Sequence, residues 1–268
     1  MNSLIKTKHG YYRFDPIPEV DYSTYYSDEK PLCIANQIED KVWWDVMYED
    51  RLRVLENAYS DSGVILDVGC GAGMFLARAR EWGWATEGID PSETALKYAK
   101  DTLNLYVSTS DIINLQSNHY SAIHCSEVLE HVADPERLLK HCYRILRKNG
   151  MVCVCVPNDF NPLQMILKQK YGEYWVSYPW HINYFSFDSL SSLMAEAGFT
   201  VIYQSAMYPL EIFAVFGIPY IGNDKLGRFI HRVRMKMDIE MSAHERSIFY
   251  EEMTRFGIGR EAIVYGIK

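Results

Sequence analysis

The stretch Val64-Ile-Leu-Asp-Val-Gly-Cys-Gly-Ala-Gly-Met-Phe-Leu76 decides the fold of this chain. Its first five residues, Val64 to Val68, form a mostly apolar run, which is typical of a strand buried on both faces of a parallel sheet. Three glycines follow at alternate positions, and Met74 to Trp82 has the pattern of a helix. Glycines at a strand-to-helix turn let the backbone approach a ligand closely, and the helix start offers free N–H groups. The stretch therefore predicts a ligand-binding turn.

The glycine spacing excludes two common phosphate-binding turns. A dinucleotide fingerprint needs a third glycine where Met74 stands, and the Gly-Lys-Ser/Thr ending of a P-loop is missing. The remaining pattern, Asp67-x-Gly69-x-Gly71-x-Gly73, resembles the first motif of class I S-adenosylmethionine (SAM) dependent methyltransferases. In that family the loop passes under the methionine part of SAM. The resemblance implies that the cofactor lies against Asp67, Gly69, Cys70, Gly71 and Gly73; an ordinary glycine-rich turn is the alternative.

Two later acidic residues extend the expected SAM site. Asp90 lies 21 residues beyond Gly69, at the end of a second predicted strand (85–90), where Pro91 and Ser92 begin a helix. An acid there can accept both ribose hydroxyls, although a simple helix-start aspartate is the alternative. In the family, an acid after the third strand (predicted over 103–107) meets the adenine amino group, and an apolar neighbour packs on the ring. Asp111 and Ile112 match those places, and Asp111 could equally be a turn residue.

The fourth predicted strand, Tyr120 to Ser126, leads into the most specific motif of the chain. Ser126-Glu-Val-Leu-Glu-His-Val-Ala-Asp-Pro135 resembles a large methyltransferase group that includes polyprenyl-quinone O-methyltransferases and many sugar and natural-product enzymes. The resemblance implies that Ser126 and Glu127 also lie at the SAM rim, and it covers roughly residues 60 to 200. The leader Lys8 to Pro16, with Tyr25 and Tyr26, resembles a bacterial subgroup tied to surface polysaccharides or small metabolites.

The alternation of strands with helices predicts an α/β fold with a mainly parallel sheet. The resemblance implies a doubly wound, Rossmann-like sheet of seven strands whose last strand is antiparallel. We expect an N-terminal arm and one helix (36–59) within residues 1–60, a SAM-binding core over 61–206, a helical insertion over 207–256 and a final core strand over 257–268. Segments 1–60 and 207–256 would supply lids. For residues 1–35 we weigh two alternatives equally: a flap over the active site, or an arm packed on the surface of the domain.

A possible metal site or general base follows from three residues after the fourth strand. Glu127, Glu130 and His131 are spaced i, i+3 and i+4, so they would share one face if the chain turned helical there. His181 follows the fifth predicted strand (151–156), which ends at the same rim of a parallel sheet. Two carboxylates and two imidazoles could hold Mg²⁺ or Mn²⁺, and the set resembles that of small-RNA 2′-O-methyltransferases. In the alternative, His181 is a metal-free catalytic base and the others are structural or adjacent to SAM.

Two further segments concern the acceptor of the methyl group. Residues 158–180 interrupt the core and are rich in aromatic side chains, which suggests a pocket for the acceptor. The 207–256 segment contains a locally basic stretch that is either a solvated face or a grip on a phosphate-bearing substrate, formed by Lys225, Arg228, Arg232, Arg234 and Lys236.

Composition narrows the class of protein. The chain of 268 residues has a net charge of −8, which disfavours nucleic acid or anionic membrane as the main partner. Its first residues have no apolar signal core, and its longest apolar stretch, 212–221, is too short to span a bilayer. The six cysteines include no C-x-x-C pair, so we expect reduced, apolar cysteines in a cytoplasmic protein.

Three functions remain open at this point. The first is a SAM-dependent methyltransferase acting on a hydroxyl oxygen of a small metabolite, a sugar or a surface-polysaccharide precursor. The second is a non-catalytic SAM-binding module or partner-activating subunit. The third is a metal-dependent RNA 2′-O-methyltransferase, against which the acidic net charge counts.

Overall fold

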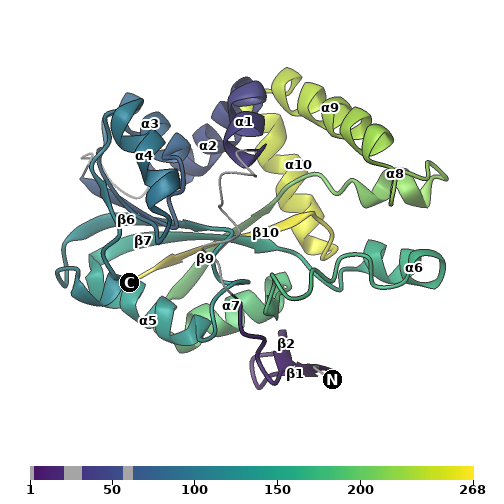
Figure 1. Ribbon diagram of the computed structural model, residues 1–268, viewed down its shortest axis with the longest axis horizontal. Coiled ribbons are helices and arrows are strands. Elements are labelled where there is room, and N and C mark those ends of the chain that lie inside the picture. The colour runs from purple at the N-terminus through teal and green to yellow at the C-terminus, as the bar shows by residue number, and fades with distance from the viewer. Residues whose placement is uncertain (1–2, 21–31, 57–62) are drawn as a thin grey trace.

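The computed structural model describes residues 3–20, 32–56 and 63–268, and it is built around a seven-stranded sheet (Figure 1). The strand order is β5-β4-β3-β6-β7-β10-β9. The first five of these strands are parallel to one another, and β10 is antiparallel to both β7 and β9. This confirms the expected seven-stranded, mainly parallel sheet. Its strands are β3 (Val64–Val68), β4 (Ala85–Ile89), β5 (Val107–Ser108), β6 (Tyr120–Ser126), β7 (Leu146–Pro157), β9 (Thr200–Ala206) and β10 (Glu261–Ile267).

Helices cover both faces of the sheet (Figure 1). One face carries α2 (Lys41–Glu56), α3 (Met74–Glu81) and α4 (Glu93–Asp101), whose buried side chains form one hydrophobic cluster with the strands. The opposite face carries α5 (Pro135–Ile145) and α7 (Phe187–Glu196), which form the second cluster. The remaining helices are α1 (Leu32–Glu39), the 3₁₀ turn η1 (Ile112–Asn114), α6 (Pro162–Tyr171), α8 (Glu211–Val215), α9 (Asp224–Glu240) and α10 (Ala243–Arg255).

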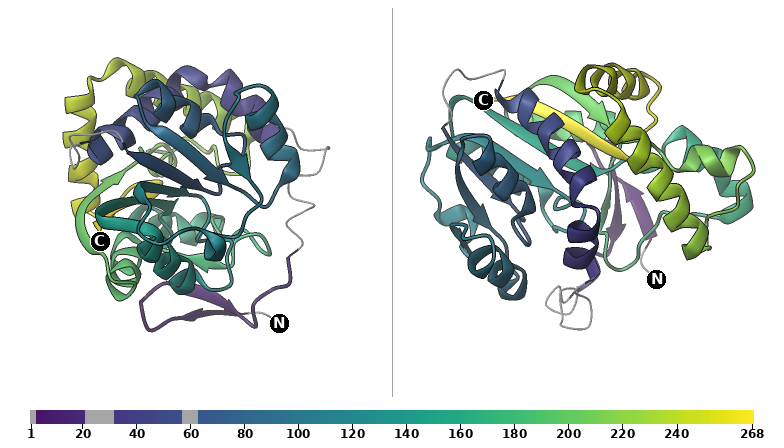
Figure 2. Two further views of the ribbon diagram at one scale, coloured as in Figure 1. Left: turned by 90° about the vertical axis from the view of Figure 1, so that its left-hand side faces the viewer. Right: turned by 90° about the horizontal axis from the view of Figure 1, so that it is seen from above.

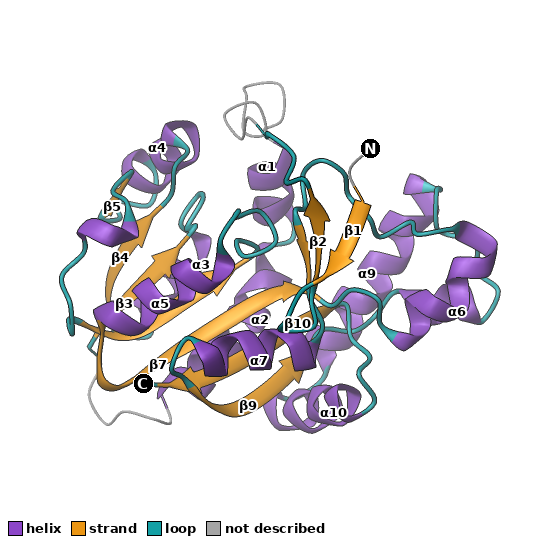
Figure 3. Ribbon diagram, turned by 90° about the horizontal axis from the view of Figure 1, so that it is seen from below, coloured by secondary structure: helices purple, strands orange, loops and turns teal. Residues whose placement is uncertain are grey.

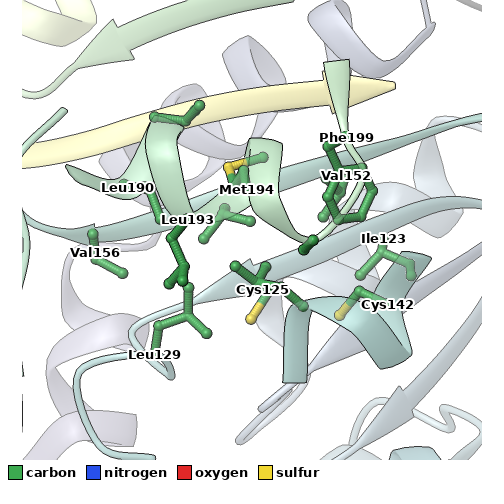
Figure 4. Close-up of a cluster of buried hydrophobic side chains, with 14 of the residues drawn as sticks. Ile123, Cys125, Leu129, Cys142, Val152, Val156, Leu190, Leu193, Met194 and Phe199 are labelled. Carbon is green, nitrogen blue, oxygen red and sulfur yellow. The ribbon is translucent and has the colours of Figure 1, made fainter. Parts of the chain in front are cut away.

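The central strands are apolar on both faces, as parallel strands between two helical layers must be. Figure 4 shows Ile123 of β6 beside Cys142 of α5, and Val152 of β7 beside Phe199, in the cluster that also contains Leu190 and Leu193 of α7. The cysteines that were expected in core strands are fully buried there, Cys125 in β6 and Cys153 and Cys155 in β7.

Two predicted elements differ from the structure. The expected helix over 36–59 is two helices, α1 and α2, separated at Asp40, and residues 57–62 lie outside the described part. The third strand is only Val107–Ser108 rather than 103–107. The reason is that the backbone N–H of Leu105 donates to the carbonyl of Ala99 in α4 (3.0 Å), and Asn104 has a left-handed backbone (φ 50°). The chain therefore closes the end of the helix before it joins the sheet.

Residues 3–15 form a hairpin that lies against the body of the protein (Figure 3). Strands β1 (Ser3–Lys6) and β2 (Tyr12–Asp15) pair with each other, and β2 also pairs with β8 (Asn183–Tyr184) in a separate three-stranded sheet. Phe14 is buried, and its N–H donates to the carbonyl of Ile182 (3.1 Å). This stretch is thus a packed arm, while residues 21–31 lie outside the described part.

The segment after β9 is helical, as expected, and it packs on α2. Figure 2 (right) shows α9 and α10 on the same side of the sheet as α2. Trp43 of α2 donates from Nε1 to Asp238 of α9 (2.7 Å), and Arg246 of α10 donates from Nε to Asp50 of α2 (2.6 Å). None of the helices in the described ranges has the length and apolar character needed to cross a bilayer.

Candidate active site

A cavity of about 290 Å³ lies beside the glycine-rich turn at the carboxyl ends of β3 and β6. We call it the glycine-loop cavity. Six of the twelve residues predicted to bind SAM line it: Asp67, Gly69, Cys70, Gly71, Ser126 and Glu127. The other six do not: Gly73, Asp90, Pro91, Ser92, Asp111 and Ile112. The cavity is where a ligand is expected in an open α/β sheet.

The three glycines of the turn have different structural roles. All three have positive φ, between 49° and 78°. A Cβ at Gly69 would lie 2.4 Å from Val128, and one at Gly73 would lie 2.6 Å from Leu105, so these two are required by packing inside the protein. A Cβ at Gly71 would have no atom within 4 Å, since this residue borders the cavity. Gly71 is therefore the point where a ligand can approach the backbone.

Asp90 is buried, and its carboxylate fixes the turn. Its Oδ2 accepts the N–H of Gly71 (2.9 Å), and its Oδ1 accepts the N–H of Ser92 (2.8 Å). Burial raises the pKa of Asp90 above its ordinary value, although the two N–H groups oppose this shift.

The residues predicted to bind adenine have structural contacts of their own. Asp111 caps η1 by accepting the N–H of Ile113 (3.0 Å), and Ile112 is buried in the core. Contact of Asp90 with ribose, and of Asp111 and Ile112 with adenine, stays a prediction.

The floor of the glycine-loop cavity contains a buried polar chain that sequence reasoning missed. Nδ1 of His124 lies 2.7 Å from Oδ1 of Asp67, and its Nε2 lies 3.1 Å from Nη1 of Arg51. The imidazole stacks on Phe75, with ring centroids 3.7 Å apart. Burial lowers the pKa of His124, so the ring is neutral. The available signal was a histidine inside the otherwise apolar strand 120–126.

Helix α2 lines one side of the glycine-loop cavity. Trp44, Tyr48 and Arg51 line it, and their spacing of four and three residues places them on one face of the helix. Trp44 and Tyr48 stack on each other with centroids 5.5 Å apart. The N-terminal helical segment therefore contributes to the site.

A second cavity of about 700 Å³ adjoins the first, and Glu127 and His181 line both. We call it the acidic cavity, because five of its lining side chains are carboxylic acids and one is an arginine. The acids are Glu127, Asp159, Glu211, Asp224 and Glu261, and the arginine is Arg260. Tyr174, Trp175 and Tyr220 supply its aromatic surface. The aromatic segment 158–180 and the helical segment 207–256 thus meet here.

The residues after β6 do not form the helix on which their shared face was predicted. Glu127 has a left-handed backbone (φ 56°), and the chain up to Asp134 is a series of turns. The turns nevertheless bring ligand atoms of Glu130, His131 and His181 within 4.8 Å of one another. Glu127 belongs to a different group, with Cys155 and Glu261. Three of the four proposed metal ligands therefore converge, through turns rather than a helix.

This three-residue group is buried and electrostatically unusual. Glu130 is fully buried, and no N–H group of another described residue donates to its carboxyl oxygens; the carboxyl of Glu127 is its side-chain hydrogen-bond neighbour. Burial, together with the nearby Glu127, raises the pKa of Glu130 well above its ordinary value. Nδ1 of His131 donates to the carbonyl of Trp180 (2.8 Å), so Nε2 carries the lone pair and faces Glu130 at 3.7 Å. Burial and then His131 lower the pKa of His181 to about 4, so its imidazole is neutral at pH 7.

Glu127 has exposed surface in the cavities, but protein surrounds its other sides. This burial, with the nearby Glu261, raises the pKa of Glu127 above its ordinary value.

Two arginines of the basic stretch contact residues outside the acidic cavity. Arg234 is buried over the ring of Trp43 (4.6 Å), Arg232 faces Glu39 (3.6 Å), and neither lines the acidic cavity. The sequence predicted that this stretch is either a solvated face or a grip on a phosphate. Arg234 fits neither prediction, because it is buried and has a structural role.

Comparison with known proteins agrees with this architecture. Residues 46–204 match the family model of a methyltransferase domain. A ubiquinone biosynthesis O-methyltransferase of Coxiella burnetii is 31% identical over 129 residues, which are 45% of this chain and 50% of that protein. The enzyme of the same name from Neisseria meningitidis is 28% identical over 170 residues, or 55% of this chain and 71% of that one.

The chain spans about half the length of the first of these relatives. Among solved structures, a SAM-dependent methyltransferase from Archaeoglobus fulgidus has a TM-score of 0.55 at 19% identity, covering 81% of this chain and 91% of that one. At this identity the likeness concerns the fold. The matched domain includes the glycine-rich turn and most of the sheet, so the chain belongs to the methyltransferase domain family and has the class I SAM-dependent methyltransferase fold.

Proposed function

We propose that this chain transfers a methyl group from SAM, bound in the glycine-loop cavity, to a hydroxyl oxygen of a small molecule in the acidic cavity. The observation that carries the proposal is that Glu127 and His181 line both cavities. A methyl donor and its acceptor must meet along one line, and adjoining cavities with a common wall allow this. The printed names of the two relatives, both O-methyltransferases, support oxygen as the target atom.

In this proposal the glycine-rich turn and the rim beside it bind SAM. Gly71 allows the backbone to approach the methionine part, and Asp90 holds the ribose. Both oxygens of Asp90 already accept an N–H, yet a carboxylate has about four lone-pair sites, so capacity remains for two hydroxyls. Pro91 and Ser92 position Asp90 at the start of α4, and Asp111 with Ile112 would serve the adenine end.

Methyl transfer is an in-line displacement at a sulfonium carbon, so the protein chiefly positions the reactants. The acceptor hydroxyl must also lose its proton. His181 is suited to take it, because its ring is neutral at pH 7 and its Nδ1 is buried with no hydrogen-bond partner among the described residues. Glu127 places a carboxyl group beside the position of the sulfonium. Helix α2 lines one side of the cavity and would exclude water.

A divalent metal is a second candidate at the same place. The residues fit one: the carboxyl of buried Glu130 receives no N–H donor from another described residue, lies beside a second carboxyl, and has two neutral imidazoles within reach. Mg²⁺ or Mn²⁺ would be held by Glu130, His131 and His181, with Glu127 nearby. When bound, it would act as a Lewis acid toward the acceptor hydroxyl.

The acidic cavity counts against RNA as the acceptor. Its five carboxylic acids would repel the phosphates of a nucleic acid, which proteins usually bind with lysine and arginine. A non-catalytic SAM-binding subunit has no need of a second cavity joined to the first. We therefore retain the small-molecule methyltransferase as the proposed function.

The test is product analysis by mass spectrometry, with methyl-labelled SAM and fractionated cell metabolites, with and without chelator. We expect label transfer in the wild type and at least about a hundredfold slower transfer in His181→Asn, the usual range for loss of a general base. His141→Asn on α5, which lines neither cavity, is the matched control. SAM binding without transfer to any fraction would favour the non-catalytic alternative. Activity lost in chelator, with Mn²⁺ bound in wild type but not in Glu130→Ala by electron paramagnetic resonance, would assign the metal.

A further inference from the structure

Three buried side chains of the acidic cavity have oxygen atoms without a hydrogen-bond donor. They are Oδ2 of Asp159, Oε1 of Gln164 and Oε2 of Glu211, and no described residue donates to them. The three side chains are only 4%, 5% and 3% exposed. Leaving a buried acceptor unsatisfied is unfavourable, so three such atoms in one cavity wall point to a ligand that donates hydrogen bonds.

The fold holds these three side chains in place. Asp159 follows β7, and its N–H donates to the carbonyl of Phe185 (2.6 Å). Asn161 caps α6 by accepting the N–H groups of Leu163 and Gln164, each at 3.0 Å. The side chains of Asp159 and Gln164 bond to each other, and α8, which contains Glu211, packs on α6. The cavity wall is thus organised before any ligand enters.

The charges around the acidic cavity specify the kind of donor. Five carboxylic acids line it, and Arg260 is the single cation among its lining side chains, since the imidazole of His181 is neutral at pH 7. Burying carboxylates is costly unless a cation accompanies them, and without a cation burial raises the pKa of Asp159 to about 8, so this acid keeps its proton at pH 7. A bound cation would let it ionise. An anionic ligand would increase that cost, a neutral polyol would leave it unchanged, and a cationic ligand would reduce it. The wall therefore favours a cation over the other two classes.

The aromatic surface of the cavity agrees with a cation. Tyr174 and Trp175 lie edge to face with centroids 5.2 Å apart, and Tyr220 lines the same cavity. Aromatic rings attract a nearby ammonium group through their quadrupole. Carboxylates and aromatic rings together thus form a wall suited to an organic cation.

We infer that the methyl acceptor carries a protonated amine, which binds between Asp159, Gln164 and Glu211. The inference rests on the proposed function, since it concerns the molecule that occupies the acidic cavity. A primary ammonium has three N–H donors. The buried side chains of the wall offer three oxygen acceptors without a partner, and the unpartnered hydroxyl of the half-buried Tyr174 lines the same cavity. The acceptor hydroxyl and this amine belong to one amino alcohol or aminophenol, and the amine determines which molecules enter.

The test compares amines with their neutral isosteres on protein loaded with S-adenosylhomocysteine, in EDTA at pH 7. The pairs are tyramine against 4-(2-hydroxyethyl)phenol, and 2-aminocyclohexanol against cyclohexane-1,2-diol, with affinities from calorimetry or ligand-observed NMR. We expect the amine of each pair to bind about tenfold tighter, the order expected for a charge-assisted hydrogen bond. Glu211→Gln should remove most of this preference. Glu252→Gln, an exposed acid paired with Arg255, should keep it.

The outcomes separate this inference from the proposed function. If S-adenosylhomocysteine itself does not bind, the methyltransferase proposal fails. If it binds but amines show no advantage, or no amine binds, or Glu211→Gln leaves the preference intact, only the amine inference is overturned. Unchanged thermal unfolding and S-adenosylhomocysteine affinity in Glu211→Gln establish that the variant is folded, and Asp159→Asn provides a second variant at the same wall.

Discussion

Nη1 of Arg51 lies 3.1 Å from Nε2 of His124, so an arginine of α2 reaches the floor of the glycine-loop cavity. A guanidinium can only donate, and Nε2 must therefore accept. The ring proton then resides on Nδ1 and is donated to Asp67 at 2.7 Å. On its other side, Nη2 of Arg51 lies 3.4 Å from Glu261. One buried cation thus links the N-terminal helix to an acid at each of the two cavities.

This linkage predicts the effect of removing Arg51. Arg51 is 3% exposed, and Arg51→Met would leave its partners without a buried donor. We expect a loss of about 3–5 kcal/mol in the free energy of unfolding, the usual cost of breaking a buried charged network. Arg53→Met, two residues along the same helix, is the control. Its side chain is 50% exposed, so we expect a loss below about 1 kcal/mol. Urea unfolding measures both, and equal losses would contradict the linkage.

A second prediction separates two glycines of the turn. Both Gly69 and Gly71 have positive φ, so alanine strains each backbone by about 1 kcal/mol. At Gly69 the new methyl group also collides with Val128, so Gly69→Ala should lose appreciably more stability. At Gly71 the methyl group points into open space beside the cavity, so Gly71→Ala should weaken SAM binding at least about tenfold, with a smaller loss of stability. Calorimetry with SAM and thermal unfolding give the comparison, and undiminished SAM affinity in Gly71→Ala would contradict it.

Most of the sheet could be predicted from the sequence, because its signals are local. The run Val64 to Val68 and the strand Tyr120 to Ser126 match the structure residue for residue, since a strand covered on both faces leaves a continuous apolar pattern. The predicted bounds of the third strand were wrong because the backbone N–H of Leu105 donates a hydrogen bond to α4, and the periodicity of the sequence does not reveal this contact. Residues 3–15 were not predicted as a hairpin because their partner, β8, lies about 170 residues later in the chain.

The candidate site could be predicted only where one motif contains it. The turn from Asp67 to Gly73 was found from its glycines, and three of four proposed metal ligands do meet. The helix that was predicted to carry three of these ligands does not form, because Glu127 adopts a left-handed backbone and the strand ends in a turn. Arg51 and Glu211 were missed because each reaches its cavity from outside the core motif. Only tertiary packing brings α2 and α8 to this rim.

A third prediction concerns the N-terminal hairpin, which supports the wall of the acidic cavity. Phe14 is buried against Tyr178 and Tyr184, with ring centroids 5.0 and 5.8 Å away, and the hydroxyl of Tyr184 donates to the carbonyl of His181. Phe14→Ala should lose about 3 kcal/mol of stability and slow methyl transfer, while SAM binds as before. Ile5→Ala on the facing strand, at an exposed position, is the control and should change neither. Full turnover in Phe14→Ala would separate the hairpin from catalysis.

The last prediction is a dependence of stability on pH that arises from Asp159. Burial raises the pKa of this carboxyl to about 8, although a hydrogen bond from Gln164 opposes the shift. In the unfolded chain its pKa is about 4, so between about pH 4 and 8 the folded state holds a proton that the unfolded state has released. Stability should therefore fall as pH rises through this range and level off above it.

Removing the charge of Asp159 should reduce this fall, to which the raised pKa values of Glu127 and Glu130 also contribute. Asp159→Asn cannot ionise, so we expect it to unfold with nearly the wild-type free energy at pH 5. At pH 8.5 it should be more stable than wild type by about 4 kcal/mol, which is about 1.4 kcal/mol for each pH unit between pH 5 and the raised pKa. Asp101→Asn, an exposed aspartate paired with Lys97, should follow the wild-type curve. Urea unfolding of the three proteins without ligand, at both pH values, is the measurement. A slope in Asp159→Asn as steep as that of the wild type would assign the dependence to Glu127 and Glu130 instead.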